Sequence, residues 1–559
     1  MSTTGTFRIL DSVEIPMGDG TILRANVWLP AEAGEWPVLL QRTAYRKDDA
    51  FGTQYISALE FMAALRRGYA IVVQDTRGRY ASDGAFVPFT HEAEDGVDTI
   101  AWLRQQSFCN GQVMMFGGSY VGATQVLAAS AHPEGLTAVS PHLTTARHGE
   151  SWTYRGGAHE LAFLLLWIIE SLGPEDLQRR LKVIPEADAQ RPTRMLAQLQ
   201  RDPHAAFSRL PILDDDLVAL APYAAQWFDA DRAASAAQDR EHLDALKSSD
   251  VPFLITPGWN DLFVEGAIEL FETVRSRYSR PEDVRDRLII GPWSHGNPSD
   301  WQGDSWLGYS ASTALLFAEQ LAFFDAARSG TSTPTPMVRY FRSGSNSWHT
   351  ATDWPIPGSE KRELFLSHSG LGPDQPEDWS RSYVSDTLNP VPTVGGANFV
   401  PGLLLGRNSG PKDQKDIESR DDVVVFTSQP LDADLEVTGL VQLSLWTASD
   451  APTADWTARL CEVDSTGKSI GLVDGIYRQP QCSNQPSEVV VKLGHISHLF
   501  ARGNRIRLQT ASSNFPRFDR NPQTGASPVL SGPGEFMRAR QTVLGGRSFP
   551  SRLSLQAIS

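Results

Sequence analysis

Short apolar β runs alternate with helical patterns through the first 145 residues, and this alternation restricts the fold more than any other feature of the chain. Strands are expected at Pro37–Leu40, Ala70–Val73 and Val113–Phe116, and helices at residues 55–67, 92–106 and 123–131. Strands joined by crossover helices form a parallel sheet with helices on its faces. Residues 12–29, which turn at Asp19-Gly20, are typical of a hairpin at a sheet edge.

This pattern is interrupted from about residue 146 to 245 and then returns. No strand is expected in the interrupting segment, which has helical stretches at residues 160–172, 193–201 and 223–241. Strands are expected again at Pro252–Ile255 and Arg287–Ile290, with helices at residues 264–278 and 312–328. We therefore predict one α/β domain from residues 1–145 and 246–350, with residues 146–245 as a helical cap insertion over its sheet.

Beyond residue 350 the chain changes to short β runs separated by turns, following a linker at Trp354–Gly358. These runs lie at Leu364–Leu366, Val423–Phe426, Leu435–Trp446, Trp456–Glu462, Val489–Val491 and Arg505–Thr510. The stretch at residues 389–411 is rich in Pro and Gly and is predicted to be a long irregular loop. Many short strands with turn signals are typical of a sandwich. Residues 351–559 are therefore predicted to form an all-β jelly-roll domain.

The charge of the chain restricts its partners. The 50 Lys and Arg residues against 66 Asp and Glu give a formal net charge of −16 among 559 residues. Such a surface repels phosphate backbones and anionic lipid, so neither nucleic acid nor a membrane is expected as a partner. The longest apolar run, Leu161–Ile169, is about half as long as a membrane span. With three scattered cysteines and no signal-peptide pattern, a cytoplasmic location is expected.

The strongest chemical motif is Phe116-Gly117-Gly118-Ser119-Tyr120-Val121-Gly122, between a β run and a helical run. A serine in a tight strand-to-helix turn, with small neighbours, is what a nucleophile elbow requires. The turn also places the hydroxyl at a helix N-terminus, where an oxyanion can be held. The literal G-x-S-x-G spacing is not met, because Val121 stands at the second glycine position. Taken alone, the motif also fits a glycine-rich turn or a phosphate-binding loop.

A serine nucleophile needs a base and an orienting acid, which α/β-hydrolases supply in the chain order Ser, Asp or Glu, His. The two later strands each lead to a candidate, Asp261 in Gly258-Trp259-Asn260-Asp261 and His295 in Gly291-Pro292-Trp293-Ser294-His295. Both follow the carboxyl end of a parallel strand, where active sites of open α/β sheets collect. Of the 12 histidines, only His295 follows a buried strand in the required order.

With these motifs the chain resembles the CocE/NonD family of serine hydrolases, relatives of bacterial cocaine esterase, α-amino-acid ester hydrolases and X-Pro dipeptidyl-peptidases. The resemblance covers nearly the whole chain, and its marks are Met17–Gly20, Gln74–Gly78, Gly117–Gly122, Gly258–Asp261, Gly291–His295 and Ser513–Asn521. The family's serine motif is G-x-S-Y-x-G, which agrees with Gly122. The resemblance implies an α/β-hydrolase domain with a helical cap insertion and a C-terminal jelly roll.

The resemblance also implies roles for individual residues. Ser119 corresponds to the nucleophile, His295 to the general base and then acid, and Asp261 to the orienting carboxylate. The oxyanion would be held by the Tyr45 hydroxyl and by the backbone N–H of Tyr120. No metal and no organic cofactor is implied. Gln74–Gly78 is expected to be structural, with Asp75 and Arg77 paired at a strand end.

The substrate contacts that the resemblance implies are aromatic. Trp152, Trp167 and Phe263 match residues that wall an acyl pocket, although plain core packing explains each equally well. Leu403 and Leu404 would close the pocket from the long loop of the β domain. A homodimer is left open, since family members often self-associate.

These observations favour hydrolysis of a small-molecule carboxylic ester through an acyl-enzyme. Cleavage of amides, such as X-Pro dipeptides or α-amino acyl groups, is the runner-up, because it needs an anionic pocket for which no carboxylate can be named. A third hypothesis is a carbohydrate-binding protein in which the hydrolase domain is inert. The pairs His495 with His498 and His142 with His148 have no recognisable carboxylate or cysteine partners, so no metal site is predicted.

Overall fold

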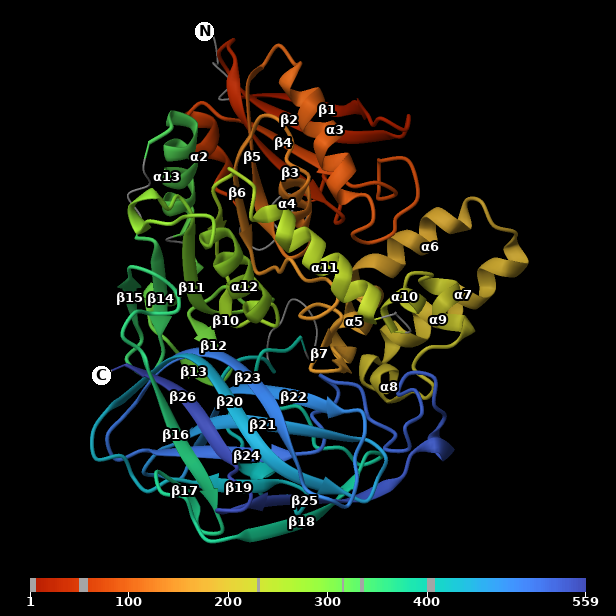
Figure 1. The fold of residues 1–559 in the computed structure, drawn as a ribbon. Helices are drawn as coiled ribbons and strands as arrows, with labels where there is room; N and C mark the ends of the chain where they lie inside the picture. Colours follow the sequence, from red (N-terminus) through yellow and green to blue (C-terminus); the bar gives the residue numbers. More distant parts are fainter. Residues whose placement is uncertain are drawn as a thin grey trace.

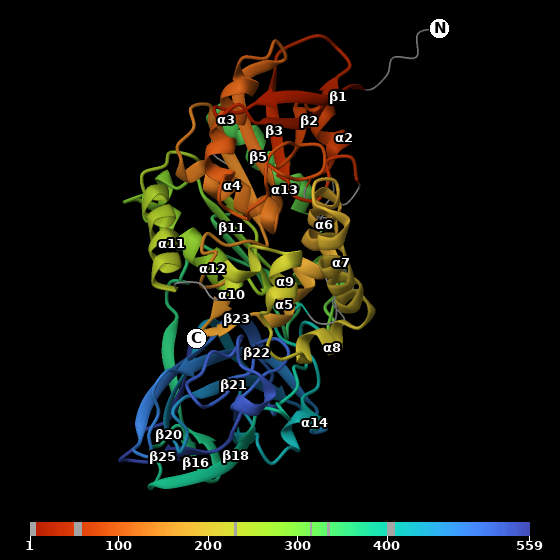
Figure 2. The ribbon, with the colours of Figure 1, turned by 90° about the vertical axis from the view of Figure 1, so that its right-hand side faces the viewer.

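The computed structural model describes residues 7–49, 59–228, 232–313, 316–331, 336–399 and 408–558. An α/β domain occupies one end of the molecule and an all-β domain the other, with a group of helices beside the junction between them (Figures 1 and 2). This arrangement confirms the predicted fold class. The residue limits given above for the domains stay predictions.

A six-stranded sheet forms the first half of the α/β domain, in the order β1-β2-β4-β3-β5-β6. Its strands are β1 (Phe7–Pro16), β2 (Ile22–Pro30), β3 (Trp36–Thr43), β4 (Ala70–Asp75), β5 (Cys109–Gly118) and β6 (Leu136–His142). The β1–β2 pair is antiparallel, which confirms the predicted hairpin, and β3, β4, β5 and β6 run parallel. Strand β6 was not predicted, because Ser140, Pro141 and His142 interrupt its apolar pattern.

The sheet continues through the strands that follow the helical insertion. These are β9 (Leu254–Ile255), β10 (Gly258–Asn260), β11 (Arg287–Ser294), β14 (Val338–Arg342) and β15 (Ser347–Ala351). Parallel bridges join Val139 to Phe253 and His142 to Thr256, so the two halves form one surface. Strand β11 is buried along its whole length, as expected for a central parallel strand covered on both faces.

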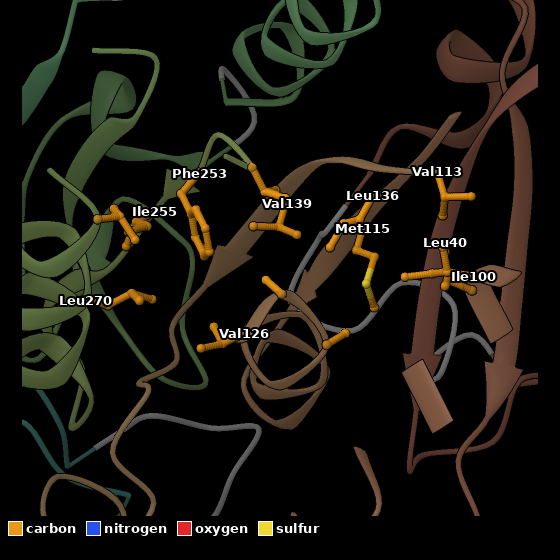
Figure 3. Close-up of a cluster of buried hydrophobic side chains, with 14 of the residues drawn as sticks. Leu40, Ile100, Val113, Met115, Val126, Leu136, Val139, Phe253, Ile255 and Leu270 are labelled. Atoms are coloured by element: carbon orange, nitrogen blue, oxygen red, sulfur yellow. The ribbon is translucent and has the colours of Figure 1, made fainter. Parts of the chain in front are cut away.

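Helices cover both faces of this sheet. The helices are α2 (Phe61–Arg66), α3 (Glu92–Arg104), α4 (Tyr120–Ser130), α12 (Val264–Arg275) and α13 (Leu316–Ser329). Ile100 of α3, Val126 of α4 and Leu270 of α12 belong to one apolar cluster, which also contains Val139 and Phe253 from the sheet (Figure 3). Side chains of α2 and α13 belong to a second cluster against the opposite face. The resulting three-layer sandwich gives the strand ends a rigid frame.

The insertion is mainly helical, as predicted. Its elements are α5 (Leu161–Leu166), a π-helical turn (Trp167–Leu172), α6 (Gly173–Leu181), α7 (Glu186–Arg201), α8 (Pro203–Ser208), α9 (Asp215–Leu220), α10 (Ala224–Phe228) and α11 (Arg232–Leu246). The expectation that this segment contains no strand was wrong, because β7 (Tyr154–Arg155) and β8 (Ala158–His159) form a two-residue hairpin. Strands this short have no detectable alternation. Helix α5 and its π-helical turn carry aromatic side chains toward the sheet domain.

The C-terminal domain consists of two antiparallel sheets around one core, which confirms the all-β prediction. One sheet contains β16 (Glu360–Ser367), β17 (Gly370–Gly372), β18 (Trp379–Asp386), β20 (Leu435–Ser449), β23 (Ser487–Phe500), β25 (Arg538–Gly545) and β26 (Arg552–Ile558). The other contains β19 (Val424–Thr427), β21 (Ala454–Val463), β22 (Ser469–Gln479) and β24 (Arg505–Ala511). Inward side chains such as Leu443 and Leu508 share one apolar cluster.

Candidate active site

Ser119 lies between β5 and α4 in a backbone conformation that few residues adopt. Its φ is 57° and its ψ is −129°, and it is the N-cap residue of α4. The residue before it must be small, because a Cβ atom built on Gly118 would lie 2.6 Å from the imidazole of His142. Glycine therefore fits position 118 of this turn. The strained serine and its glycine neighbour are the features of a nucleophile elbow.

The glycine spacing of the motif also has a steric explanation. A Cβ on Gly117 would lie 2.3 Å from Val121, and a Cβ on Gly122 would lie 2.7 Å from Thr144. The close approach to a neighbouring segment is therefore made by residue 122, and Val121 packs back over Gly117. This is why the second glycine stands one position later than in G-x-S-x-G.

Three side chains from distant parts of the chain meet at this turn. Ser119 Oγ lies 2.9 Å from His295 Nε2, and His295 Nδ1 lies 2.6 Å from Asp261 Oδ2. All three residues are buried. The other carboxylate oxygen of Asp261 accepts a hydrogen bond of 2.7 Å from the backbone N–H of Phe263. With Nδ1–H donating to the carboxylate, Nε2 is free to accept the serine proton.

Two hydrogen-bond donors lie at the same place. Trp167 Nε1 donates to the Tyr45 hydroxyl at 3.1 Å, and the same hydroxyl is hydrogen-bonded with Ser119. Burial raises the pKa of Tyr45, and hydrogen bonds with Trp167 and Ser119 only partly oppose this rise. Tyr120 is the first residue of α4, so its backbone N–H is one of those that a helix leaves without an internal acceptor.

An aromatic cluster surrounds these groups and contains each described residue that was predicted to line the acyl pocket. Trp152 and Phe263 stack with ring centroids 4.2 Å apart, and Phe263 lies 5.0 Å from the ring of His295. Trp167 lies 5.4 Å from Trp152. Leu403 and Leu404 lie outside the described residues, so their predicted contact stays a prediction.

Further aromatic residues belong to the cluster and were not predicted, among them Phe399 and Phe163. Phe399 lies 5.0 Å from the His295 ring and 5.2 Å from Phe163, which in turn stacks on Trp167 at 5.7 Å. Phe399 comes from the loop of the β domain that was expected only to be irregular. Phe163 precedes Trp167 by one helical turn, and this spacing could have indicated it. The sheet domain, the cap and the β domain therefore all contribute to the cluster.

Two buried carboxylates that pack behind the cluster are bound to other groups. Glu92 accepts a hydrogen bond of 2.6 Å from the Tyr120 hydroxyl and lies 3.0 Å from the guanidinium of Arg42. Asp176 accepts from Arg79 at 2.7 Å and from the hydroxyl of Tyr223 at 2.8 Å. Both carboxylates support the walls of the site.

The expected pairing of Asp75 with Arg77 was wrong. Asp75 accepts hydrogen bonds from the backbone N–H groups of Lys47, at 2.6 Å, and Ala81, at 3.1 Å. Arg77 forms two hydrogen bonds with Asp95, at 2.6 and 3.0 Å. At a strand end the two side chains point to different neighbours, and their separation of two residues did not reveal this.

One of the two histidine pairs considered for a metal site, His495 with His498, has glutamate partners that the sequence did not reveal. His495 Nδ1 lies 2.9 Å from Glu265, and His498 Nε2 lies 2.9 Å from Glu462. Each of these two histidines thus has its own carboxylate. Within the part of the chain that the structure describes, no three His, Cys, Asp or Glu side chains come together in a metal-binding group.

Two family models match the chain. The X-Pro dipeptidyl-peptidase (S15 family) model matches residues 19–297, and the X-Pro dipeptidyl-peptidase C-terminal non-catalytic domain model matches residues 329–554. The cocaine esterase of Rhodococcus sp. (strain MB1 Bresler) is 33% identical over 99% of both chains.

Among solved structures, a selenomethionine-labelled α-amino acid ester hydrolase is similar over 100% of this chain and 97% of its own, with 25% identity and a TM-score of 0.77. An aminopeptidase from a marine sediment archaeon, Thaumarchaeota archaeon, covers the same shares with 23% identity and a TM-score of 0.79. The second likeness shows a shared fold.

The mixed sheet, the strained serine turn and these relatives define a serine hydrolase of the α/β-hydrolase fold that acts on esters or peptides. Within that class, the chain belongs to the CocE/NonD family, the cocaine esterase-like serine hydrolases. Among the described residues, no helix has both the length and the apolarity that crossing a membrane requires.

Proposed function

We propose that this protein hydrolyses carboxylic esters through an acyl-enzyme formed on Ser119. The observation that carries the proposal is the continuous hydrogen-bonded series from Ser119 Oγ to His295 and on to Asp261, at 2.9 and 2.6 Å. His295 Nε2 takes the proton of Ser119 as Oγ attacks the ester carbonyl. Asp261 holds the imidazole in the required tautomer and stabilises the imidazolium that forms.

The tetrahedral intermediate carries a negative oxygen. We assign its two hydrogen bonds to the Tyr45 hydroxyl and the Tyr120 backbone N–H, in agreement with the hydrogen bond between Tyr45 and Ser119 and the position of Tyr120 at the start of α4. His295 then gives its proton to the leaving alcohol as the C–O bond breaks. His295 then deprotonates a water molecule, which attacks the acyl-enzyme. As the bond between the acyl carbon and Ser119 Oγ breaks, the acid is released and His295 returns the proton to Ser119.

The surroundings support an uncharged acyl group with an apolar or aromatic body. The rings of Trp152, Phe263 and Phe399 lie next to His295 and Ser119 and carry no charge. Aromatic walls of this kind bind flat apolar groups by edge and face contacts. We propose that Leu403 and Leu404, from the segment that follows Phe399, complete this wall.

Amide cleavage is the second candidate, because the catalytic family model is named for X-Pro dipeptidyl-peptidases. That activity requires a carboxylate for the free amino group of the substrate. Two of the buried acids near the aromatic cluster, Glu92 and Asp176, are occupied by Arg42 and Arg79 and offer no free carboxylate to an amino group. These ion pairs favour esters over α-amino amides.

The test combines active-site labelling with a substrate comparison. Wild type and Ser119→Ala are treated with phenylmethylsulfonyl fluoride and weighed by intact-mass spectrometry, and a panel of p-nitrophenyl esters is compared with glycyl-prolyl-p-nitroanilide. One adduct on wild type, none on Ser119→Ala, and hydrolysis of esters only is the expected result. Preferred cleavage of the anilide would favour the second candidate. No adduct and no hydrolysis would refute both and favour the carbohydrate-binding hypothesis.

A further inference from the structure

The C-terminal segment Ser513–Asn521 lies against the cap. It is one of the motifs that the chain shares with the family, but the sequence assigns it no role. The backbone oxygen of Pro516 accepts a hydrogen bond from Ala162 in the first turn of α5 at 3.1 Å. Asp519 accepts from the backbone N–H of His159 at 2.8 Å, and its other oxygen lies 3.0 Å from the ring of the same histidine. Residues 360 positions apart in the chain, His159 and Asp519, are therefore joined just before α5.

A series of buried charges continues from this contact toward the active site. Arg517 donates to Asp474 at 2.6 Å within the β domain and to both oxygens of Glu160 at 3.4 Å. Arg155 Nε donates to Glu160 at 3.1 Å. Arg517 and Glu160 are each about 1% exposed, so water does not screen these contacts. Arg459 also donates to Asp474 at 2.8 Å, so each carboxylate of the series contacts two guanidinium groups, and a buried charge requires such partners.

The free end of the Arg155 guanidinium reaches the backbone of the candidate acid loop. Its Nη2 donates to the carbonyl oxygen of Leu262, which stands between Asp261 and Phe263. Phe263 in turn donates its N–H to Asp261, and its ring lies against His295. A displacement of the Leu262 carbonyl would therefore move both the carboxylate and the ring that face the histidine.

We propose that Arg155 is a positioning residue through which the β domain holds the Asp261–Phe263 loop in its reactive geometry. Arg517 fixes Glu160, Glu160 orients the guanidinium of Arg155, and the guanidinium fixes Leu262. Since Asp261 acts on Ser119 through His295, this inference rests on the proposed ester hydrolysis. It gives the β domain, which carries no member of the Ser–His–Asp set, a part in setting the reaction rate.

The variants Arg155→Ala, Arg517→Ala and the double variant test this series, with wild-type hydrolysis of a p-nitrophenyl ester measured first. For Arg155→Ala we expect kcat to fall roughly 10- to 100-fold with KM nearly unchanged, because misplacement of a reacting group acts on the chemical step. The double variant should be no slower than Arg155→Ala, since Arg517 acts on the Leu262 carbonyl only through Glu160 and Arg155. Guanidinium chloride at millimolar concentration should restore part of the kcat of Arg155→Ala.

Arg275→Ala is the matched control, because Arg275 also binds one carboxylate, Asp353, and one backbone carbonyl, that of Tyr278. Its side chain is 15% exposed, against 11% for Arg155. The control should lower Tm without lowering kcat. If Arg155→Ala does not fold, Arg155→Lys replaces it, since one ammonium cannot serve both Glu160 and Leu262.

Three results would overturn the proposal: an unchanged kcat in a folded Arg155 variant, an equal loss in Arg275→Ala, or losses in Arg155→Ala and Arg517→Ala that multiply in the double variant. An inactive wild type would instead refute the proposed function itself, so the two failures are distinguishable.

Discussion

Replacing Tyr45 with phenylalanine removes one buried oxygen atom and tests the proposed reaction at a single hydrogen bond. The hydroxyl accepts from Trp167 Nε1 at 3.1 Å and is also hydrogen-bonded with Ser119, so its position beside the nucleophile is fixed. Because burial raises the pKa of Tyr45, the phenol stays protonated and remains a donor at neutral pH. The aromatic ring is kept in Tyr45→Phe, so packing around it should change little.

The expected effect on rate follows from the role of the hydroxyl. Loss of one preorganised donor to a tetrahedral oxyanion lowers kcat by roughly 100- to 1000-fold, equivalent to about 3–4 kcal/mol of barrier. Loss of the acceptor also leaves the indole N–H of Trp167 buried and without its partner, which costs about 1–3 kcal/mol of folding stability. The two effects separate, because the first appears in kcat and the second in Tm.

Tyr383→Phe is the control for stability. Tyr383 lies in the β domain, is buried like Tyr45, and shares a hydrogen bond of 2.8 Å with Ser512. Stopped-flow measurement of the p-nitrophenol burst gives the acylation rate, and thermal unfolding gives Tm. Both variants should lower Tm by a similar amount, and only Tyr45→Phe should slow the burst. An acylation rate within about threefold of wild type, far below the loss expected for an oxyanion donor, would refute the assignment.

Other substitutions test the frame around the site. The pair of Glu265 and His495 joins α12 to β23. Burial opposes ionisation of Glu265, but His495 outweighs this effect and lowers the pKa of Glu265 to about 2. Glu265 in turn raises the pKa of His495 against the effect of burial. The pair should therefore stabilise most between about pH 4.5 and 6.5, losing strength toward pH 2 as Glu265 protonates and above pH 6.5 as His495 loses its proton. Thermal unfolding of Glu265→Gln should show a flatter pH dependence than wild type, and parallel curves would contradict this. A Cβ on Gly258 would lie 2.3 Å from the backbone oxygen of Trp293, so Gly258→Ala should separate β10 from β11. We expect the free energy of unfolding in urea to fall by about 1–3 kcal/mol and kcat to fall as well. If neither value changes, the strand pair is not rigid. Trp152→Ala should raise KM for aryl esters more than for acetyl esters, and an equal change for both would remove Trp152 from the proposed acyl wall.

Much of the fold follows from local patterns along the chain. The alternation of strands and helices, the Asp19-Gly20 turn and the two-residue period of β20 each depend on neighbouring residues, and each was predicted. The positions of Asp261 and His295 could also be inferred, because parallel strands end at one edge of a sheet. Strand β6 and the β7–β8 hairpin were missed, since polar residues or short length removed their periodicity.

What the sequence determined by itself is therefore the order of elements, the serine turn and the identity of the candidate triad. Only the tertiary structure decided which side chains surround that triad. Phe399 comes within reach of His295 across 104 positions of the chain, and Arg517 reaches Glu160 across 357. Such contacts depend on how complete domains pack against one another, and no periodicity in either segment encodes them. A motif such as Ser513–Asn521 shows its role only through the cap residues that it holds.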